Sequence, residues 1–154
     1  MGMAEYLRQL FEYDRWANHA ALASLGNSVS QADKPFKVFS HVIGAQRVWR
    51  ARFDDPPSGA QPWPVLKREE CSAAIEDAYE RWMELLGRLI DAELGRDLVY
   101  LTTQGVEFRT PVRDVLTHLL MHSAYHRGQV AAAVREAGGK PASTDYVAYL
   151  RQRK

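Results

Sequence analysis

Apolar positions recur every three or four residues along four long stretches of the chain, which is the spacing of amphipathic helices. In the first stretch the stripe runs through Leu7, Leu10, Asp14, Ala17 and Ala21. Pro35 favours the start of the second helix, and Thr110 followed by Pro111 is typical of an N-cap and a first helical residue. The pattern predicts helices at about residues 3–25, 36–53, 68–94 and 111–137.

Three connecting or terminal stretches carry no long helical pattern. Asp54–Pro64 is rich in proline and is expected to be a loop rather than a domain linker, because neither flanking piece could bury its apolar face alone. Residues 97–110 form either a short hairpin around Gly105 or an extended crossover, and propensity leaves both open. Residues 143–151 are a short helix at most. The sequence predicts an all-α four-helix bundle with a long crossover connection, as one domain over residues 1–154.

Composition narrows the class of protein. The chain has 154 residues, 46% of them hydrophobic, and a net charge of +1, so it lacks the excess of basic groups that a nucleic-acid partner requires. It has no apolar run of membrane-spanning length and no apolar signal core at its start, so we expect no membrane partner and a cytoplasmic location. The lone Cys71 has two carboxylates beside it in Arg-Glu-Glu-Cys, which disfavour a thiolate, and we expect it on a helix surface or in the core.

Three of the five histidines, His118, His122 and His126, fall within nine residues of the fourth predicted helix. At 100° per residue, His126 points about 40° from the apolar direction, His122 about 80° and His118 about 120°. His118 and His126 are about 12 Å apart along the axis, too far to share an ion that binds each nitrogen at about 2.1 Å. The inward pair is therefore His122 with His126.

A third ligand for such a pair must come from another helix. His41 flanks the apolar stripe of the second helix and is better placed than His19. The alternative is that these are hydrogen-bonded core histidines, which are more common at the edge of an apolar stripe. Position 123 is Ser, which excludes the His-Glu-x-x-His motif of zinc proteases, and the chain has no Glu-x-x-His motif of a ferritin-like di-iron site.

Four segments of the chain carry characteristic motifs: the first-helix Tyr13–Asn18 segment, the second-helix Ser40–Gly44 segment with Trp49, the fourth-helix His118–Val130 segment and the ending Asp145–Arg151. Together they resemble the motifs of the DinB/YfiT-like superfamily of metalloenzymes. This resemblance implies a four-helix bundle, commonly dimeric, in which one histidine of the second helix and two of the fourth hold a divalent metal. By matching motifs those ligands are His41, His122 and His126.

Three neutral histidines leave a divalent ion its full charge and at least one open coordination position. Bound thiol would be presented as thiolate, as in an S-transferase, and bound water as hydroxide, as in a hydrolase. Both reactions on a small-molecule substrate stay open, and zinc or nickel is the default metal. A low-molecular-weight thiol as cofactor follows from the resemblance alone. The alternative is a non-enzymatic metal-binding or stress-response bundle.

Other polar side chains are candidates for supporting roles. Arg127 is the one candidate catalytic residue, because it could hold an anionic substrate group, but it could equally face solvent or form a salt bridge to a neighbouring helix. Gln129 or Asn18 could orient a ligand histidine.

The aromatic residues suggest both a pocket and an interface. Trp16, Trp49 and Tyr125 could line a pocket, although aromatics at this spacing are usually core residues. Four tryptophans and seven tyrosines exceed what a small bundle needs inside. With the resemblance, this favours a homodimer.

Overall fold

The computed structural model describes residues 1–26, 29–30, 33–54 and 59–153. Its long helices are α1 (Met3–Ser24), α2 (Lys34–Ala51), α3 (Arg68–Arg88) and α4 (Val112–Glu136). The shorter elements are the 3-10 turn η1 (Asp91–Glu93), the strands β1 (Asp97–Leu101) and β2 (Glu107–Pro111), and the helix α5 (Tyr146–Gln152). The architecture confirms the predicted all-α bundle. Within the described residues, no helix combines the length and the apolar character needed to cross a membrane.

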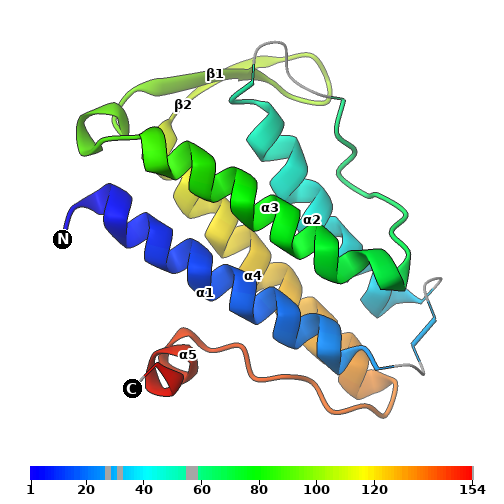
Figure 1. Cartoon of the computed structure of the whole chain (residues 1–154). Helices are drawn as coiled ribbons and strands as arrows, with labels where there is room; N and C mark the ends of the chain where they lie inside the picture. Colours follow the sequence, from blue (N-terminus) through cyan, green and yellow to red (C-terminus); the bar gives the residue numbers. More distant parts are fainter. Residues whose placement is uncertain (27–28, 31–32, 55–58, 154) are drawn as a thin grey trace.

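The four long helices pack as a ring in which α1 and α2 each contact both α3 and α4 (Figure 1). Helices α3 and α4 therefore lie across the bundle from one another, and the chain between them must pass over one end. The antiparallel β1–β2 hairpin makes this crossing, with Asp97 paired to Pro111 and Leu101 to Glu107. Residues 97–110 are thus a hairpin, and α5 lies against α1.

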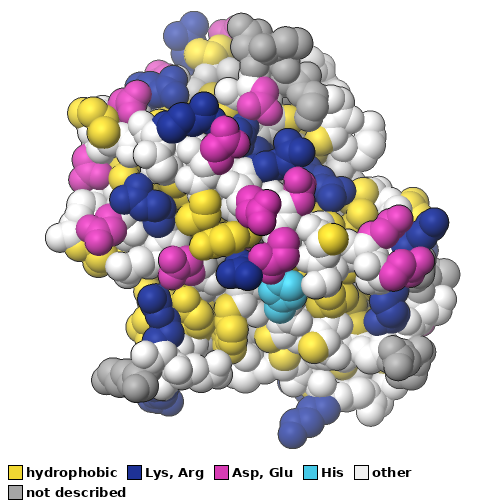
Figure 2. Space-filling model, viewed as in Figure 1, with side chains coloured by type: hydrophobic (Ala, Val, Ile, Leu, Met, Phe, Trp, Pro, Cys, Tyr) yellow, Lys and Arg dark blue, Asp and Glu magenta, His cyan; other side chains and the backbone are white. Residues whose placement is uncertain are grey.

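Two apolar clusters fill the two ends of the bundle. Near the hairpin, residues such as Phe11, Trp82 and Leu116 pack together, and at the other end Phe39 and Ile43 pack with their neighbours. Between the clusters, the helices contribute buried polar residues: Asp14, Asn18, Gln46, Ser123 and Arg127. The surface is mixed, because basic and acidic side chains are interspersed on the face that Figure 2 shows.

The predicted start of the fourth helix is wrong by one residue, and its cap differs in kind. Thr110 and Pro111 belong to β2, and α4 begins at Val112. The backbone N–H of Val112 donates to the Arg96 carbonyl oxygen at 2.9 Å, and the backbone N–H of Arg113 donates to the Leu94 carbonyl oxygen at 2.9 Å. Backbone carbonyls of the preceding turn thus satisfy the helix start, so the Thr110 side chain is not needed as an N-cap.

The predicted end of the third helix is also wrong. Helix α3 stops at Arg88, because Leu89 adopts an extended backbone with ψ of 131°. Leu89 and Leu94 are nevertheless buried, 6% and 2% exposed, since η1 turns the chain back onto the core. Buried apolar residues therefore continue beyond the end of α3, although the helix does not.

Candidate metal centre

Helices α2 and α4 bring His41, His122 and His126 together at their contact. One ring nitrogen from each lies within 4.8 Å of the other two. The Nε2 atoms of His122 and His126 are 3.2 Å apart. Two nitrogens that each bind one ion at about 2.1 Å are separated by about 3.0 to 3.4 Å, so this spacing suits a shared ion.

The outer nitrogens of two of these rings are held by oxygen acceptors. His126 Nδ1 lies 2.7 Å from Gln129 Oε1, and His41 Nδ1 lies 2.7 Å from the Pro62 carbonyl oxygen. Because a carbonyl or amide oxygen only accepts, each Nδ1 carries the proton and donates it, which leaves the Nε2 lone pair unprotonated. Both rings are therefore fixed in the tautomer and orientation that metal-binding histidines use.

The acceptor for His41 comes from the loop before α3, which packs closely on α2 at Gly44. A Cβ atom at Gly44 would lie 2.4 Å from the Pro62 carbonyl oxygen and 2.4 Å from Pro64 Cδ, so only glycine admits this approach. The same loop stacks Trp63 on the His41 ring at a centroid distance of 3.9 Å and an interplanar angle of 10°. We refer to residues 62–64 as the His41 strap.

Sequence reasoning missed the strap entirely. Pro62 and Trp63 lie 21 and 22 residues after His41, in a loop whose proline content indicates only irregular structure. The available signal was Gly44, a residue without a side chain one turn after His41 on an otherwise bulky helix face.

The cluster has no internal counter-charge. Burial is the largest cause that lowers the pKa of His122, and together with the neighbouring His126 and His41 it brings this pKa to about 4. Burial also lowers the pKa of His41, against the opposing effect of its hydrogen bond to Pro62. His122 Nδ1 is buried without a hydrogen-bond partner in the described part of the chain. Three neutral imidazoles whose ring nitrogens lie this close together are a donor set suited to a divalent cation.

The site reaches the surface on its outer side. Trp63 is 57% exposed and Tyr125 is 66% exposed, and the Tyr125 ring lies 5.1 Å from that of His126. Among the residues with described positions, no fourth His, Cys, Asp or Glu joins the three histidines. An ion held here would thus keep coordination positions for a group from outside the chain.

The other two histidines are not members of this group. His118 is exposed, as its helical direction predicts, and its ring packs 5.4 Å from that of Trp49 and 5.6 Å from that of His122. His19 pairs with Glu76 of α3, with 2.5 Å between Nε2 and Oε1. Of the predicted aromatic wall residues, Tyr125 adjoins the site, whereas Trp16 packs 5.4 Å from the Tyr149 ring of α5.

Arg127 points to a different side of α4 from the histidines, into the buried polar layer. Its guanidinium forms an ion pair with Asp14 of α1 and donates from Nη1 to Asn18 Oδ1 at 2.9 Å. Arg127 is only 2% exposed, so of its predicted roles the geometry supports the salt bridge to a neighbouring helix. Asn18 is engaged in that layer, so the orienting role falls to Gln129.

Comparison with known proteins assigns the family. The sequence profile of the DinB family matches residues 3–154. The chain belongs to the DinB family. Protein DinB of Bacillus subtilis (strain 168) is 28% identical in an alignment 170 positions long, which covers 96% of this chain and 95% of that protein. No solved structure matches the chain. The resemblance read from the helix motifs is thereby confirmed for this DinB-family chain.

Proposed function

We propose that this DinB-family chain binds one divalent metal ion through His41, His122 and His126. The observation that carries the proposal is the convergence of their ring nitrogens: Nε2 atoms 3.2 Å apart on α4, with the outer nitrogens of His41 and His126 already hydrogen-bonded. Imidazole ligands suit zinc and nickel, and we take these as the metals to test first.

The proposal extends to catalysis of thiol transfer or hydrolysis on a small molecule. A bound divalent ion supplies Lewis acidity, which lowers the pKa of a coordinated thiol or water. The chain's own thiol is unsuited to this reaction, because Cys71 is fully buried and burial raises its pKa to about 11. A thiol substrate or cofactor would therefore be a separate small molecule that enters beside the exposed Trp63.

Metal analysis of purified protein tests the ligand assignment. We expect about one equivalent of ion per chain in the wild type, and loss of most of it in His122→Ala, since two remaining ligands bind far more weakly. The matched control is His118→Ala, which removes an exposed histidine of the same helix outside the group. Stoichiometric metal in His122→Ala, or its loss in His118→Ala, would contradict the assignment.

Chelation separates a catalytic ion from a structural one. The bundle has two apolar clusters and long helices that do not depend on the histidines, so we expect the helical circular dichroism to survive metal removal. Activity in a thiol-conjugation or ester-hydrolysis screen should disappear, and a small thiol should change the spectrum of a cobalt-substituted site. Unfolding on chelation, with a cobalt spectrum that ignores thiols, would favour the non-enzymatic alternative.

We further propose that the chain forms a homodimer. Met121 and Tyr125 are 68% and 66% exposed on the outer face of α4, and an apolar helix face of this kind is commonly covered by a partner. Light scattering at micromolar concentration should give about twice the chain mass of 17.5 kDa. A single-chain mass would reject this part of the proposal.

A further inference from the structure

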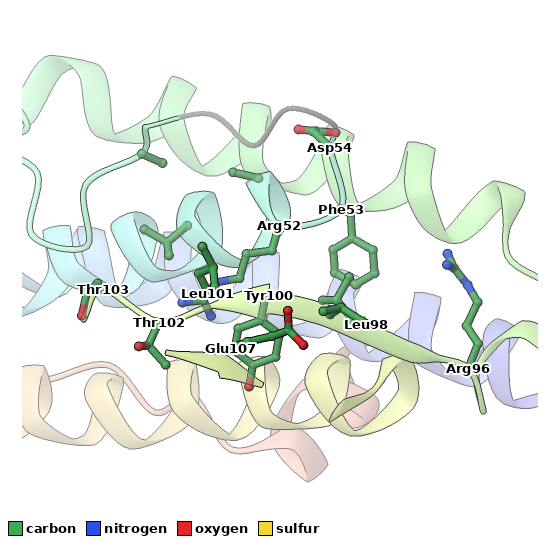
Figure 3. A pocket seen from close by; sticks show the side chains of 14 residues that line it. Arg52, Phe53, Asp54, Arg96, Leu98, Tyr100, Leu101, Thr102, Thr103 and Glu107 are labelled. Atoms are coloured by element: carbon green, nitrogen blue, oxygen red, sulfur yellow. The ribbon is translucent and has the colours of Figure 1, made fainter. Parts of the chain in front are cut away.

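A cavity of about 560 Å³ lies between the C-terminal end of α2 and the β1–β2 hairpin (Figure 3). Its volume is within the range of about 300 to 1,000 Å³ of small-molecule sites. Arg52 lines it and follows His41 by 11 residues, a rise of about 16 Å along a helix, so the cavity is separate from the histidine centre. Much of the remaining wall is apolar, from Ala51, Phe53, Leu98, Val99 and Leu101.

Two aromatic rings hold the Arg52 guanidinium at this wall. Its central carbon lies 4.0 Å from the centroid of Trp49 and 4.6 Å from that of Tyr100. Arg52 thus bridges α2 and the hairpin, toward which it extends in Figure 3. Stacking on rings engages the flat faces of a guanidinium and leaves its N–H groups, which lie in the plane, directed outward at the edge.

The positive charge of Arg52 has no acidic partner in the described part of the chain. The Arg52 side chain donates no hydrogen bond and forms no ion pair to any residue in that described part. Burial disfavours the charged form of its guanidinium and lowers the pKa of Arg52. The two described acids at the cavity are engaged elsewhere: Asp54 pairs with Arg50 at 2.7 Å, and Glu107 lies 3.7 Å from Arg109. A fixed guanidinium with free edge donors is the arrangement that binds a carboxylate through two hydrogen bonds.

We propose that this cavity binds a small amphipathic monoanion, with its carboxylate on the edge of Arg52 and its apolar body against Phe53 and Leu98. The proposal needs neither a metal ion nor the three histidines. It assigns the chain a second site, for an organic acid with a hydrocarbon portion.

Octanoate and octan-1-ol are matched probes, because they share the hydrocarbon chain and differ in the anionic group. We expect octanoate to shift the amide signals of residues 52–53 and 98–102 in ¹H–¹⁵N spectra, in metal-free and metal-loaded protein alike. Octan-1-ol should bind there at least about tenfold more weakly, since it cannot form charge-assisted hydrogen bonds.

Substitutions locate the preference at Arg52. In Arg52→Gln, octanoate should lose its advantage and bind no better than octan-1-ol, whereas Arg52→Lys, which keeps the charge without the planar fork, should retain part of it. The matched control is Arg88→Gln, which removes an exposed arginine at the end of α3 that pairs with Glu84. That variant should discriminate between the probes as the wild type does.

Three results would overturn the proposal, and the first two need no variant. Equal binding of the two probes to the wild type would show an apolar cleft without anion recognition. Signal shifts confined to residues around His41 and His126, and only in metal-loaded protein, would place the acid on the metal ion instead. Undiminished octanoate preference in a folded Arg52→Gln protein would remove Arg52 as the anchor.

Discussion

Two polar clusters lie in the same stretch of α4, on sides that face different helices, and they are built on different principles. Arg127 faces α1, where its charge is matched by Asp14, and the two side chains are 1% and 3% exposed. His122 and His126 face α2, where their neighbour His41 is a third group of the same kind. The first cluster is complementary in charge, and among its described donors only Arg127 Nε lacks a partner, whereas the second brings together three groups of the same kind.

The difference separates a structural cluster from a binding site. Asp14 Oδ2 also accepts from Gln46 Nε2 at 2.6 Å and from Asn18 Nδ2 at 3.0 Å, so the acid is engaged from three directions. Arg127 Nε has no hydrogen-bond partner among the described residues, but the adjoining cavity of about 10 Å³ is too small for an organic ligand. The histidines instead bring three ring nitrogens together with no acid among them, and a cation from outside the chain could be bound by all three. A buried polar cluster whose groups have no partner of opposite charge within the bundle is therefore the one to test for function.

The largest expected effect comes from breaking the complementary cluster. Asp14→Ala leaves the Arg127 charge buried without its acid, which should lower the free energy of unfolding by about 3–5 kcal/mol. Urea denaturation followed by circular dichroism measures it. The double variant Asp14→Leu with Arg127→Met should recover much of the loss, because neither charge then remains buried.

The exposed pair Asp77–Arg81 is the control for that prediction. Its side chains are 46% and 60% exposed on α3, so Asp77→Ala should change the free energy of unfolding by less than about 1 kcal/mol. The comparison fails if Asp14→Ala leaves stability intact and instead releases the metal. The two clusters would then act as one site.

Helix periodicity predicted the pair His122 and His126 because both lie on one helix. Their directions follow from 100° per residue along α4, and His118 is the most exposed of the three histidines on that helix, as the same geometry requires. The partner of Arg127 also had a signal in the sequence, since Asp14 stands in the apolar stripe of α1. Pairing them, however, requires knowing that α1 contacts α4, which the pattern of a single helix does not contain.

The His41 strap was not predictable by the same means. Its contacts join residues about 21 positions apart through irregular backbone, where no period relates sequence to direction. The predicted end of α3 and the predicted start of α4 are wrong for a similar reason. Carbonyls of Leu94 and Arg96, brought by η1 and the hairpin, cap α4, and such tertiary contacts override side-chain capping preferences.

An intermediate effect is expected from Gly44→Ala, which tests whether the histidine centre depends on the strap. The new Cβ would meet the Pro62 carbonyl oxygen at 2.4 Å, so the strap must move away from His41. We expect about 1–3 kcal/mol lower stability from overpacking. Metal affinity, measured by competition with a chelator, should fall roughly 10- to 100-fold because His41 loses its orienting acceptor.

The control for Gly44→Ala is Gly87→Ala, on α3, where nothing lies within 4 Å of an added Cβ. Alanine is the better helix former there, so stability should stay equal or rise by up to about 1 kcal/mol. Unchanged metal affinity in a Gly44→Ala protein that is clearly destabilised would show that the strap supports the fold and not the centre.

The smallest expected effect is the acid sensitivity of the histidine centre in metal-free protein. The pKa of His122 is about 4 in the folded chain against 6.5 ordinarily, so between these values the unfolded chain binds more protons than the folded one. The free energy of unfolding should therefore decrease as the pH falls from about 6.5 to 4. Because His122 is only partly buried, we expect this contribution to be on the order of 1 kcal/mol. Denaturation of His122→Gln over the same range should show a shallower loss, since Gln does not titrate. Parallel pH profiles for the two proteins would mean that the folded environment does not resist protonation of His122, and that the centre is better solvated than its burial indicates.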